Sequence, residues 1–252
     1  MSKVVLVSFL VLIGAGPHLS AETPRNVTFT WYGQSCFLIT TPQGTKILTD
    51  PIELKDYKVP YDVVPDVVTV SHNHFDHNAV GTVSGHPEIV YGKTREESDP
   101  EQKFIPVDKK IKEARIYNVV SNHFPAGVSP VLNAIFVFEF DSLRIVHLGD
   151  LGMTLTPEQI EKIGRVDILM IPVGGKYTIF GPTTDSVVAQ LKPTRAVIPM
   201  HFKTRVADFL PYTADDFVTG KTNVERVSGH EYAFVLNSPV AGLKYVVFDC
   251  FK

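Results

Sequence analysis

Three histidines and one aspartate are crowded into six positions directly after an apolar stretch of the chain. The apolar stretch covers residues 66–70, and the six positions are His72-Asn73-His74-Phe75-Asp76-His77. A loop at the end of a strand can turn all four side chains toward one point, and zinc, manganese and iron accept imidazole nitrogen and carboxylate oxygen as ligands. An exposed polar loop would explain a single histidine, but it explains this spacing poorly. The segment therefore predicts a metal site where a strand ends.

Three further residues of ligand type also follow apolar strands. His123 comes after residues 116–120, Asp150 after residues 144–148, and His201 after residues 196–200. Gly149 lets the backbone come close to a site that a Cβ atom would obstruct. Because sites in α/β sheets assemble in the loops beyond strand ends, these three side chains are expected to join the histidine cluster.

The spacing of apolar residues changes along the chain. Short β-type stretches at residues 27–32, 36–40 and 46–49 are separated by turns, which predicts antiparallel strands. Further strands are expected at residues 66–70, 89–91, 116–120, 132–140, 144–148, 167–171 and 195–199. Helices are expected at residues 78–83, 156–163 and 184–191, the last capped by Thr183 or Thr184. Strands joined by both hairpins and crossovers indicate an α/β fold with helix-covered sheets.

The first 21 residues are expected to be a secretory signal peptide. Lys3 gives a positive start, residues 4–13 are apolar, and Leu19-Ser20-Ala21 resembles a cleavage site. The apolar run is short for a transmembrane helix, which needs about 20 residues. Because Leu19 is larger than the residue preferred three positions before a cut, an uncleaved anchor is the alternative. Cleavage would leave residues 22–252 as one secreted or periplasmic domain, without stable membrane insertion and long enough for a buried core.

The charge balance indicates the kind of partner. The chain has 24 basic and 27 acidic residues, and removing residues 1–21 takes away Lys3 alone, so 23 basic residues remain and the net charge is −4. Nucleic-acid surfaces carry a clustered positive excess, so no nucleic-acid partner is expected. A small-molecule substrate is expected instead, and the sequence leaves the oligomeric state open.

Cys36 and Cys250 are the only cysteines, and both lie in apolar, strand-like stretches. An exported protein could join them in a disulfide. Two buried free thiols are the alternative, because the sequence does not give the separation that a disulfide demands. Neither cysteine has a catalytic partner motif beside it.

The order and spacing of the ligand-type residues resemble the motifs of the metallo-β-lactamase superfamily. The resemblance covers essentially the whole chain after residue 21, and its motifs are Asp50, residues 72–77, His123, residues 149–150 and His201. A closer resemblance is to the small metal-dependent hydrolases that include ascorbate-6-phosphate lactonase, through residues 31–39, 47–51, 147–150 and 198–202. The implied fold is an α/β, metallo-β-lactamase-type four-layer αββα sandwich.

The resemblance implies two divalent metal ions, zinc first, with manganese or iron as alternatives. It assigns seven ligands to two groups with Asp150 bridging them: His72, His74 and His123 on one ion, and Asp76, His77 and His201 on the other. The implied nucleophile is a hydroxide between the ions, with Asp76 and Asp150 as catalytic residues and Asp76 or a bound water handling the proton. Asp50 is expected to orient a ligand and not to bind an ion.

The expected reaction is hydrolysis of an ester, a lactone or a phosphodiester. A true β-lactamase is not expected, because Asp76, His77 and Asp150 resemble the branches in which a bridging carboxylate replaces a cysteine ligand. Lys176 or Tyr177 could contact an anionic substrate, although solvated turn residues are the alternative. Lys176 and residues 179–182 depart from the family pattern, so the substrate stays open.

Two other functions are weighed against hydrolysis. A flavodiiron-like oxidoreductase shares the implied fold, but that group has glutamate where this chain has His74, and no flavin domain fits in the remaining length. A metal-binding protein without turnover would be indicated by missing ligands or by a site sealed from solvent.

The remaining histidines are expected to have structural roles or none. His147 lies inside a strand and is expected to be a packed, hydrogen-bonded core residue. His86 and His230 each follow a glycine and are expected in surface turns. His18 belongs to the segment expected to be removed.

Overall fold

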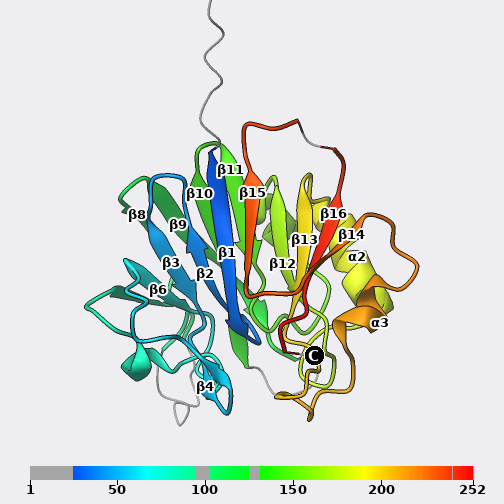
Figure 1. Cartoon of the computed structure of the whole chain (residues 1–252), viewed down its shortest axis with the longest axis horizontal. Helices are drawn as coiled ribbons and strands as arrows, with labels where there is room; N and C mark the ends of the chain where they lie inside the picture. Colours follow the sequence, from blue (N-terminus) through cyan, green and yellow to red (C-terminus); the bar gives the residue numbers. More distant parts are fainter. Residues whose placement is uncertain (1–24, 95–102, 125–130, 240, 252) are drawn as a thin grey trace, which may run out of the picture.

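Two large sheets and three short α-helices make up the described part of the chain, which confirms the α/β prediction. The structure is a computed structural model that describes residues 25–94, 103–124, 131–239 and 241–251. The expected signal peptide at residues 1–21 lies outside the described residues. Figure 1 shows strands β1 to β3 of the N-terminal sheet, in blue, in front of the green strands of the second sheet.

The N-terminal sheet has six strands in the order β15-β1-β2-β3-β6-β7. The strands are β1 (Asn26–Gly33), β2 (Cys36–Thr40), β3 (Lys46–Thr49), β6 (Val67–Val70), β7 (Glu88–Tyr91) and β15 (Glu231–Val235). β15, β1, β2 and β3 are antiparallel neighbours, whereas β3, β6 and β7 run parallel. The short strands β4 (Glu53–Leu54) and β5 (Tyr57–Lys58) pair separately. β15 comes from the C-terminal part of the chain and closes the free side of β1.

The second sheet has eight strands in the order β14-β16-β13-β12-β11-β10-β9-β8. The strands are β8 (Asp108–Ile111), β9 (Ala114–Asn122), β10 (Leu132–Phe140), β11 (Leu143–His147), β12 (Ile168–Pro172), β13 (Ala196–Met200), β14 (Val224–Val227) and β16 (Lys244–Phe248). β9 and β11 are both antiparallel to β10, and β11, β12 and β13 are parallel. The carboxyl ends of β9, β11 and β13 therefore reach the same edge of the sheet.

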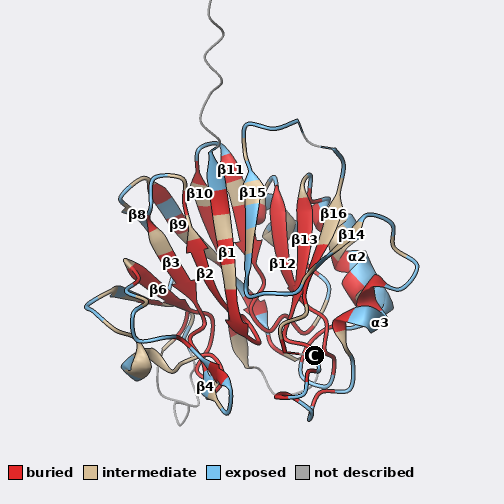
Figure 2. Ribbon diagram, in the orientation of Figure 1, coloured by how far each residue is buried: buried red, intermediate tan, exposed pale blue. Residues whose placement is uncertain are grey.

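One hydrophobic core fills the space between the sheets. The ring of Trp31 in β1 lies 6.1 Å from that of Phe248 in β16, so the two sheets meet through aromatic side chains. Every residue of β12 and β13 is buried, as expected for central parallel strands covered on both faces. In Figure 2 the buried residues run through the middle strands, and the exposed residues lie mainly in connecting loops and at the outer edges.

The helices are short and begin with recognisable capping residues. They are α1 (Pro157–Ile163), α2 (Pro182–Leu191), α3 (Ala214–Val218) and the 3-10 turn η1 (Val80–Thr82). Thr156 caps α1 and forms a capping box with Gln159, which confirms the predicted start of that helix. The predicted cap of α2 is wrong: Gly181 is the N-cap, because Pro182 has the fixed φ that suits the first helical position.

The predicted helix at residues 78–83 is reduced to η1, which is a single 3-10 turn with no buried residue. Without a buried face, a longer helix there would gain little from packing. α3 was not predicted, although Thr213 and Asp216 form a capping box at its start. In the described ranges, no helix has the length and apolar character needed to cross a membrane.

Candidate metal centre

The loop after β6 brings four predicted ligand residues to one place. His72 and His77 are fully buried, Asp76 is 6 % exposed, and His74 is half-buried. The backbone N–H of His77 donates to the carbonyl oxygen of His74 at 3.0 Å, which closes a turn between them. His72 Nε2 lies 3.1 Å from His74 Nδ1, so these two imidazoles direct nitrogen atoms toward a common point.

The other three predicted residues follow β9, β11 and β13, at the shared edge of the second sheet. His123, Asp150 and His201 are all buried. His201 has a φ of 48°, which is uncommon for a residue with a Cβ atom, and its N–H donates to the carbonyl oxygen of Gln34 at 3.3 Å. Backbone strain of this kind persists where the surrounding structure fixes it, and it is concentrated at functional sites.

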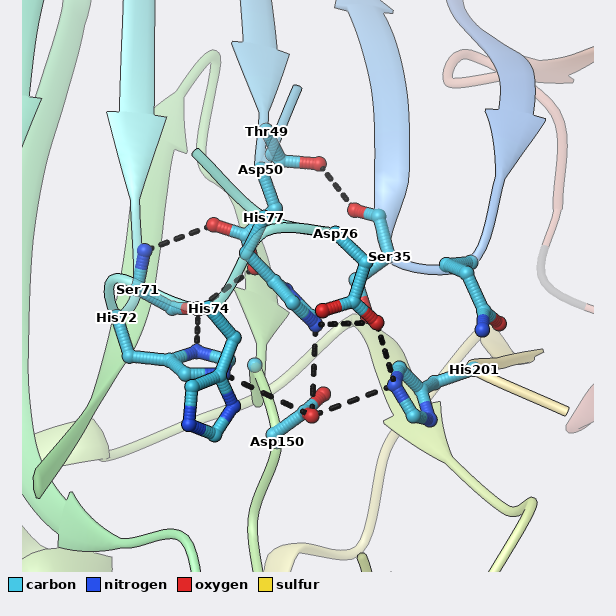
Figure 3. A network of polar contacts seen from close by, with 12 residues as sticks. Ser35, Thr49, Asp50, Ser71, His72, His74, Asp76, His77, Asp150 and His201 are labelled. Atoms are coloured by element: carbon cyan, nitrogen blue, oxygen red, sulfur yellow. Dashed lines mark hydrogen bonds and ion pairs between the residues drawn. The ribbon is translucent and has the colours of Figure 1, made fainter. Parts of the chain in front are cut away.

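Asp150 stands at the centre of the cluster. Its Oδ2 atom lies 3.2 Å from His123 Nε2, 3.4 Å from His77 Nε2 and 3.3 Å from His201 Nε2. The same oxygen is 3.8 Å from His72 Nε2. Figure 3 shows this carboxylate between the imidazoles of the loop after β6 and that of His201. One carboxylate oxygen is thus within reach of ligands from both sheets.

Asp76 extends the cluster on the side of His77 and His201. Its Oδ2 atom lies 3.6 Å from His77 Nε2 and 3.5 Å from His201 Nε2. We therefore distinguish a first ligand group, His72, His74 and His123, from a second ligand group, Asp76, His77 and His201. Asp150 lies between the two groups.

Asp50 connects the two ligand groups through hydrogen-bond contacts. It directly follows β3 and has a φ of 39°, and its Oδ2 atom lies 2.9 Å from His77 Nδ1. The same carboxylate accepts hydrogen bonds from the backbone N–H and the hydroxyl of Ser71, at 2.7 and 2.6 Å, and that hydroxyl lies 2.9 Å from His72 Nδ1. Asp50 thus fixes one imidazole directly and another through Ser71, as Figure 3 shows.

Gly149 allows the chain to pass close to this centre. Its φ is +54°, and a Cβ atom there would collide with Asn133 Oδ1 and lie 2.8 Å from Ser71 Cβ. The expectation that a glycine is needed before Asp150 is confirmed. The close approach places the loop after β11 against the loop after β6, across the two sheets.

The imidazoles of the two groups differ in proton affinity. Burial lowers the pKa of His72 far below its usual range, with the imidazole of His77 acting in the same direction, and burial also lowers the pKa of His74. At His77, burial acts against the charged form, but Asp150 and Asp76 raise the pKa well above the usual range. Asp150 overcomes burial in the same way at His201 and raises its pKa.

The carboxylates respond in the opposite direction. Burial would raise the pKa of Asp150, but the imidazoles of His201 and His77 hold it well below the usual range. Burial would likewise raise the pKa of Asp76, but His77 and His201 lower it. Both side chains are therefore anionic at neutral pH and can act as ligands.

The residues fit bound cations. Ligand atoms of His72, His74, His123 and Asp150 all lie within 4.8 Å of one another, and so do those of Asp76, His77 and His201. Tetrahedral zinc with bonds of about 2.0–2.1 Å requires ligand atoms roughly 3.3 Å apart, close to the distances given above. Five buried atoms of these side chains have no hydrogen-bond partner: His77 Nε2, both ring nitrogens of His123, Asp150 Oδ1 and His201 Nδ1. Unpartnered buried polar atoms are costly, and a cation would compensate those that face the centre.

A cavity of about 490 Å³ opens onto the cluster. The ligand residues in its wall are His74, Asp76, His123, Asp150 and His201, and the other lining residues are Phe75, Phe124, Tyr177 and Phe209. The centre is therefore reachable from solvent and is not sealed. Tyr177, predicted as a possible substrate contact, lines the cavity, whereas Lys176 does not.

Comparisons with known proteins agree with this geometry. Residues 28–201 match the sequence family described as the beta-lactamase superfamily domain. The chain belongs to the metallo-β-lactamase superfamily. It is a metal-dependent hydrolase of that superfamily, with histidine and aspartate clusters able to bind metal.

Relatives in this superfamily cover most of the chain. A UPF0173 protein of Pyrococcus furiosus is 31 % identical over 185 residues, which cover 69 % of this chain and 82 % of the relative. A UPF0173 metal-dependent hydrolase of Methanoregula boonei is 29 % identical over 189 residues, with the same two coverages.

A solved structure from Thermotoga maritima, described as a candidate Zn-dependent hydrolase of the metallo-β-lactamase superfamily, has 33 % identity and a TM-score of 0.69. The matched region covers 88 % of this chain and 98 % of the Thermotoga maritima chain. These matches confirm the predicted family and its metallo-β-lactamase-type fold.

Two residues that support this metallo-β-lactamase centre were missed in the sequence. Ser71 links Asp50 to His72, and Asn133 Oδ1 accepts the backbone N–H of Asp150 at 3.0 Å. The amide nitrogen of Asn133 donates to Ser121 Oγ and to the carbonyl oxygen of Leu148. The sequence feature that could have indicated this role is a polar asparagine within the otherwise largely apolar stretch that forms β10.

The other histidines and the cysteines lie outside the centre. His147 is fully buried and hydrogen-bonded to the carbonyl oxygen of Ser35 through Nε2 at 2.9 Å, which confirms its predicted core role. His86 and His230 are exposed, as predicted. Cys36 and Cys250 are free thiols, so of the two alternatives the structure has the unpaired one, with Cys36 buried and Cys250 only partly so.

Proposed function

We propose that this chain holds two divalent metal ions and hydrolyses a small ester, lactone or phosphodiester. The observation that carries the proposal is the position of Asp150 Oδ2, which is 3.2–3.4 Å from imidazole nitrogens of both ligand groups. A carboxylate that lies between two groups of ligand side chains can bind one ion of each group and so bridge the two ions. The seven residues predicted as ligands would all take part.

In this proposal the first ligand group holds one ion and the second ligand group holds the other. Five imidazoles and two carboxylates suit zinc first, with manganese or iron as alternatives. Supporting zinc, the similar Thermotoga maritima protein is described as a candidate Zn-dependent hydrolase. Bound cations of this kind supply Lewis acidity and lower the pKa of a water molecule toward neutrality.

The protein's own residues then orient the reactants and move protons. Asp50 holds the His77 ring through Nδ1, which leaves Nε2 of that ring directed at Asp76 and Asp150. Asp76 lies in the cavity wall and is anionic at neutral pH, so one of its oxygens can orient the attacking water and relay its proton to the leaving oxygen. Asp150 lies in the same wall and fixes the geometry of the two ligand groups.

Turnover is favoured over metal binding alone because the centre opens into a cavity. A protein that only stores or senses a metal has no need for a substrate-sized space beside the ligands. A diiron β-hydroxylase of Streptomyces venezuelae has the same fold at 14 % identity, with a TM-score of 0.57. A likeness at that level concerns the fold alone, and the oxidoreductase alternative gains no residue-level support from it.

We further propose that residues 1–21 direct export and that residues 22–252 are the mature domain in the periplasm or outside the cell. Amino-terminal sequencing of the protein recovered from those fractions should begin at Glu22. Retention of the full chain in the membrane fraction would indicate an uncleaved anchor instead.

The proposal is tested with a panel of carboxylic esters, lactones, phosphodiesters and β-lactams. The metal content is measured first, and turnover is then compared between the metal-loaded protein and protein treated with a chelator. We expect hydrolysis of at least one ester, lactone or phosphodiester, lost on chelation and restored by added metal. Activity that survives complete removal of metal would refute the proposal.

A further inference from the structure

Among the described residues, the wall of the cavity is aromatic wherever it is not made of ligands. Phe75, Phe124, Tyr177 and Phe209 provide it, and no lysine or arginine is among the described lining residues. Lys176 precedes Tyr177 in the loop after β12, and its ammonium group lies over the Tyr177 ring, 4.9 Å from the centroid. An anionic part of a substrate would therefore find no positive side chain among the described residues of this wall.

Exposed aromatic rings gather around this cavity. Six aromatic side chains of the described residues are exposed, and three of them line the cavity: Phe75, Tyr177 and Phe209. Phe75 is 69 % exposed and Phe209 is 38 % exposed. Grouped apolar surface of this kind indicates a binding site, because covering it releases water from both partners.

We infer that the substrate is a carboxylic ester or lactone with an uncharged, apolar acyl chain, and that Phe75 and Phe209 bind this chain. The inference rests on the proposed hydrolase function and narrows its substrate class. In the reaction, a water oxygen bonds to the acyl carbon, the bond from that carbon to the alcohol oxygen breaks, and the alcohol oxygen receives a proton. The products are a carboxylic acid and an alcohol, or one hydroxy acid from a lactone.

The wall also argues against phosphodiesters as the preferred class. A phosphodiester keeps a negative charge on its non-bridging oxygens, and proteins usually meet such oxygens with arginine, lysine or grouped backbone N–H donors. Apart from the ions that Asp76 and Asp150 would hold, the described wall offers such oxygens only aromatic rings. An uncharged acyl group avoids this mismatch.

The test uses p-nitrophenyl acetate, butanoate, hexanoate and octanoate together with bis(p-nitrophenyl) phosphate, all with the full metal-loaded protein. Each buried methylene is worth up to about a fourfold gain in kcat/KM, so we expect a clear rise from acetate to octanoate. Phe209→Ala and Phe75→Ala should each lower kcat/KM for the octanoate by about tenfold while changing the value for the acetate little.

Phe180→Ala is the matched control for Phe209→Ala. Phe180 is 43 % exposed and stacks on Tyr212 at 4.7 Å between ring centroids, but it does not line the cavity. This variant should stay within about twofold of the native protein on every ester, as expected for an exposed side chain away from the reaction.

A binding measurement separates the chain-binding role from turnover. Calorimetry with 1-butanol, 1-hexanol and 1-octanol on metal-free protein should give a dissociation constant that falls with chain length, and Phe209→Ala should flatten this trend. An equal affinity for the three alcohols would overturn the inference whatever the enzyme assays give.

The outcomes also separate this inference from the proposed function. Hydrolysis that ignores chain length, or that favours the phosphodiester, would overturn the acyl-chain inference and leave the hydrolase intact. No metal-dependent hydrolysis of any substrate would overturn both. A third outcome is a rate increase only with micellar substrate, together with equal impairment of Phe180→Ala and Phe209→Ala. This result would indicate docking on a lipid surface and would also refute the acyl-chain role.

Discussion

The two ligand groups use similar side chains but are held by the protein in different ways. In the first ligand group, His72 and His74 have lowered pKa values, and the contact of His72 with Asp50 runs through Ser71. In the second ligand group, His77 contacts Asp50 directly and has a raised pKa. His72 and His74 are therefore ready for a cation at neutral pH, whereas His77 and His201 must release protons to bind one.

The most severe test of this comparison removes the carboxylate that both groups share. In Asp150→Ala, four imidazole nitrogens lose a common acidic neighbour, so we expect both ions and all metal-dependent turnover to be lost, a drop of at least about 1,000-fold. Metal content per chain and turnover are measured on the same preparation.

Asp167→Ala serves as the control for that variant. Asp167 is also a buried aspartate next to a strand of the second sheet, directly before β12. It accepts hydrogen bonds from the backbone N–H of Arg144 and the hydroxyl of Thr194, and it does not line the cavity. It should lower the melting temperature and leave the metal content unchanged. Full turnover in Asp150→Ala would contradict the shared role.

The next largest effect is expected from changing the residues that contact the ligand imidazoles. Asp50→Asn weakens the direct contact with His77, so we expect a 10- to 100-fold loss of metal affinity, mainly in the second ligand group. Ser71→Ala removes the contact with His72 and should weaken mainly the first. Competition with a chelator of known affinity measures both. Equal losses in both groups for both variants would show that the groups are not held independently.

The metal affinities of the two ligand groups should also depend differently on pH. Because the pKa values of His77 and His201 are raised, a cation entering the second ligand group displaces protons at neutral pH and below. Its affinity should rise as pH increases toward those pKa values, by up to about tenfold per pH unit for each proton displaced, and then level off. The first ligand group, with lowered pKa values at His72 and His74, should change little over the same range. Chelator competition between about pH 6 and 8 follows both ions, and parallel curves for them would refute the difference.

The smallest expected effect concerns the close approach of the two ligand loops. Gly149→Ala places a Cβ against Asn133 and Ser71 at a positive φ, so it should destabilise the fold by about 1–3 kcal/mol. Thermal unfolding measures the loss. Gly44→Ala, where φ is also positive but no atom lies within 4 Å of the added Cβ, separates the cost of φ from the cost of the collision.

The two routes by which ligands reach the centre explain how much the sequence could predict. The loop at residues 72–77 carries its ligands within six positions, so its chemistry is visible without any fold. His123, Asp150 and His201 were predicted because each follows a strand, and parallel strands end at one edge. The strands β2, β3 and β10 have the predicted bounds, since their apolar stretches stop at clear turn residues.

What the sequence could not predict depends on contacts between distant segments. β15 pairs with β1 from some 200 residues away, and its residues 231–235 are half exposed and carry a weak strand pattern. Nothing in the local sequence distinguishes Ser71 and Asn133 from other polar residues, because their contacts with Asp50 and Asp150 form only in the folded protein. The aromatic wall comes from separate loops, so no local motif marks it.

Anomalous X-ray diffraction from crystals of the metal-loaded protein shows whether seven side chains hold two cations with Asp150 between them. We expect two anomalous peaks per chain, one bonded to His72, His74 and His123 and the other to Asp76, His77 and His201, with an oxygen of Asp150 bonded to both. A single peak, or two peaks without Asp150 as a shared ligand, would contradict this arrangement.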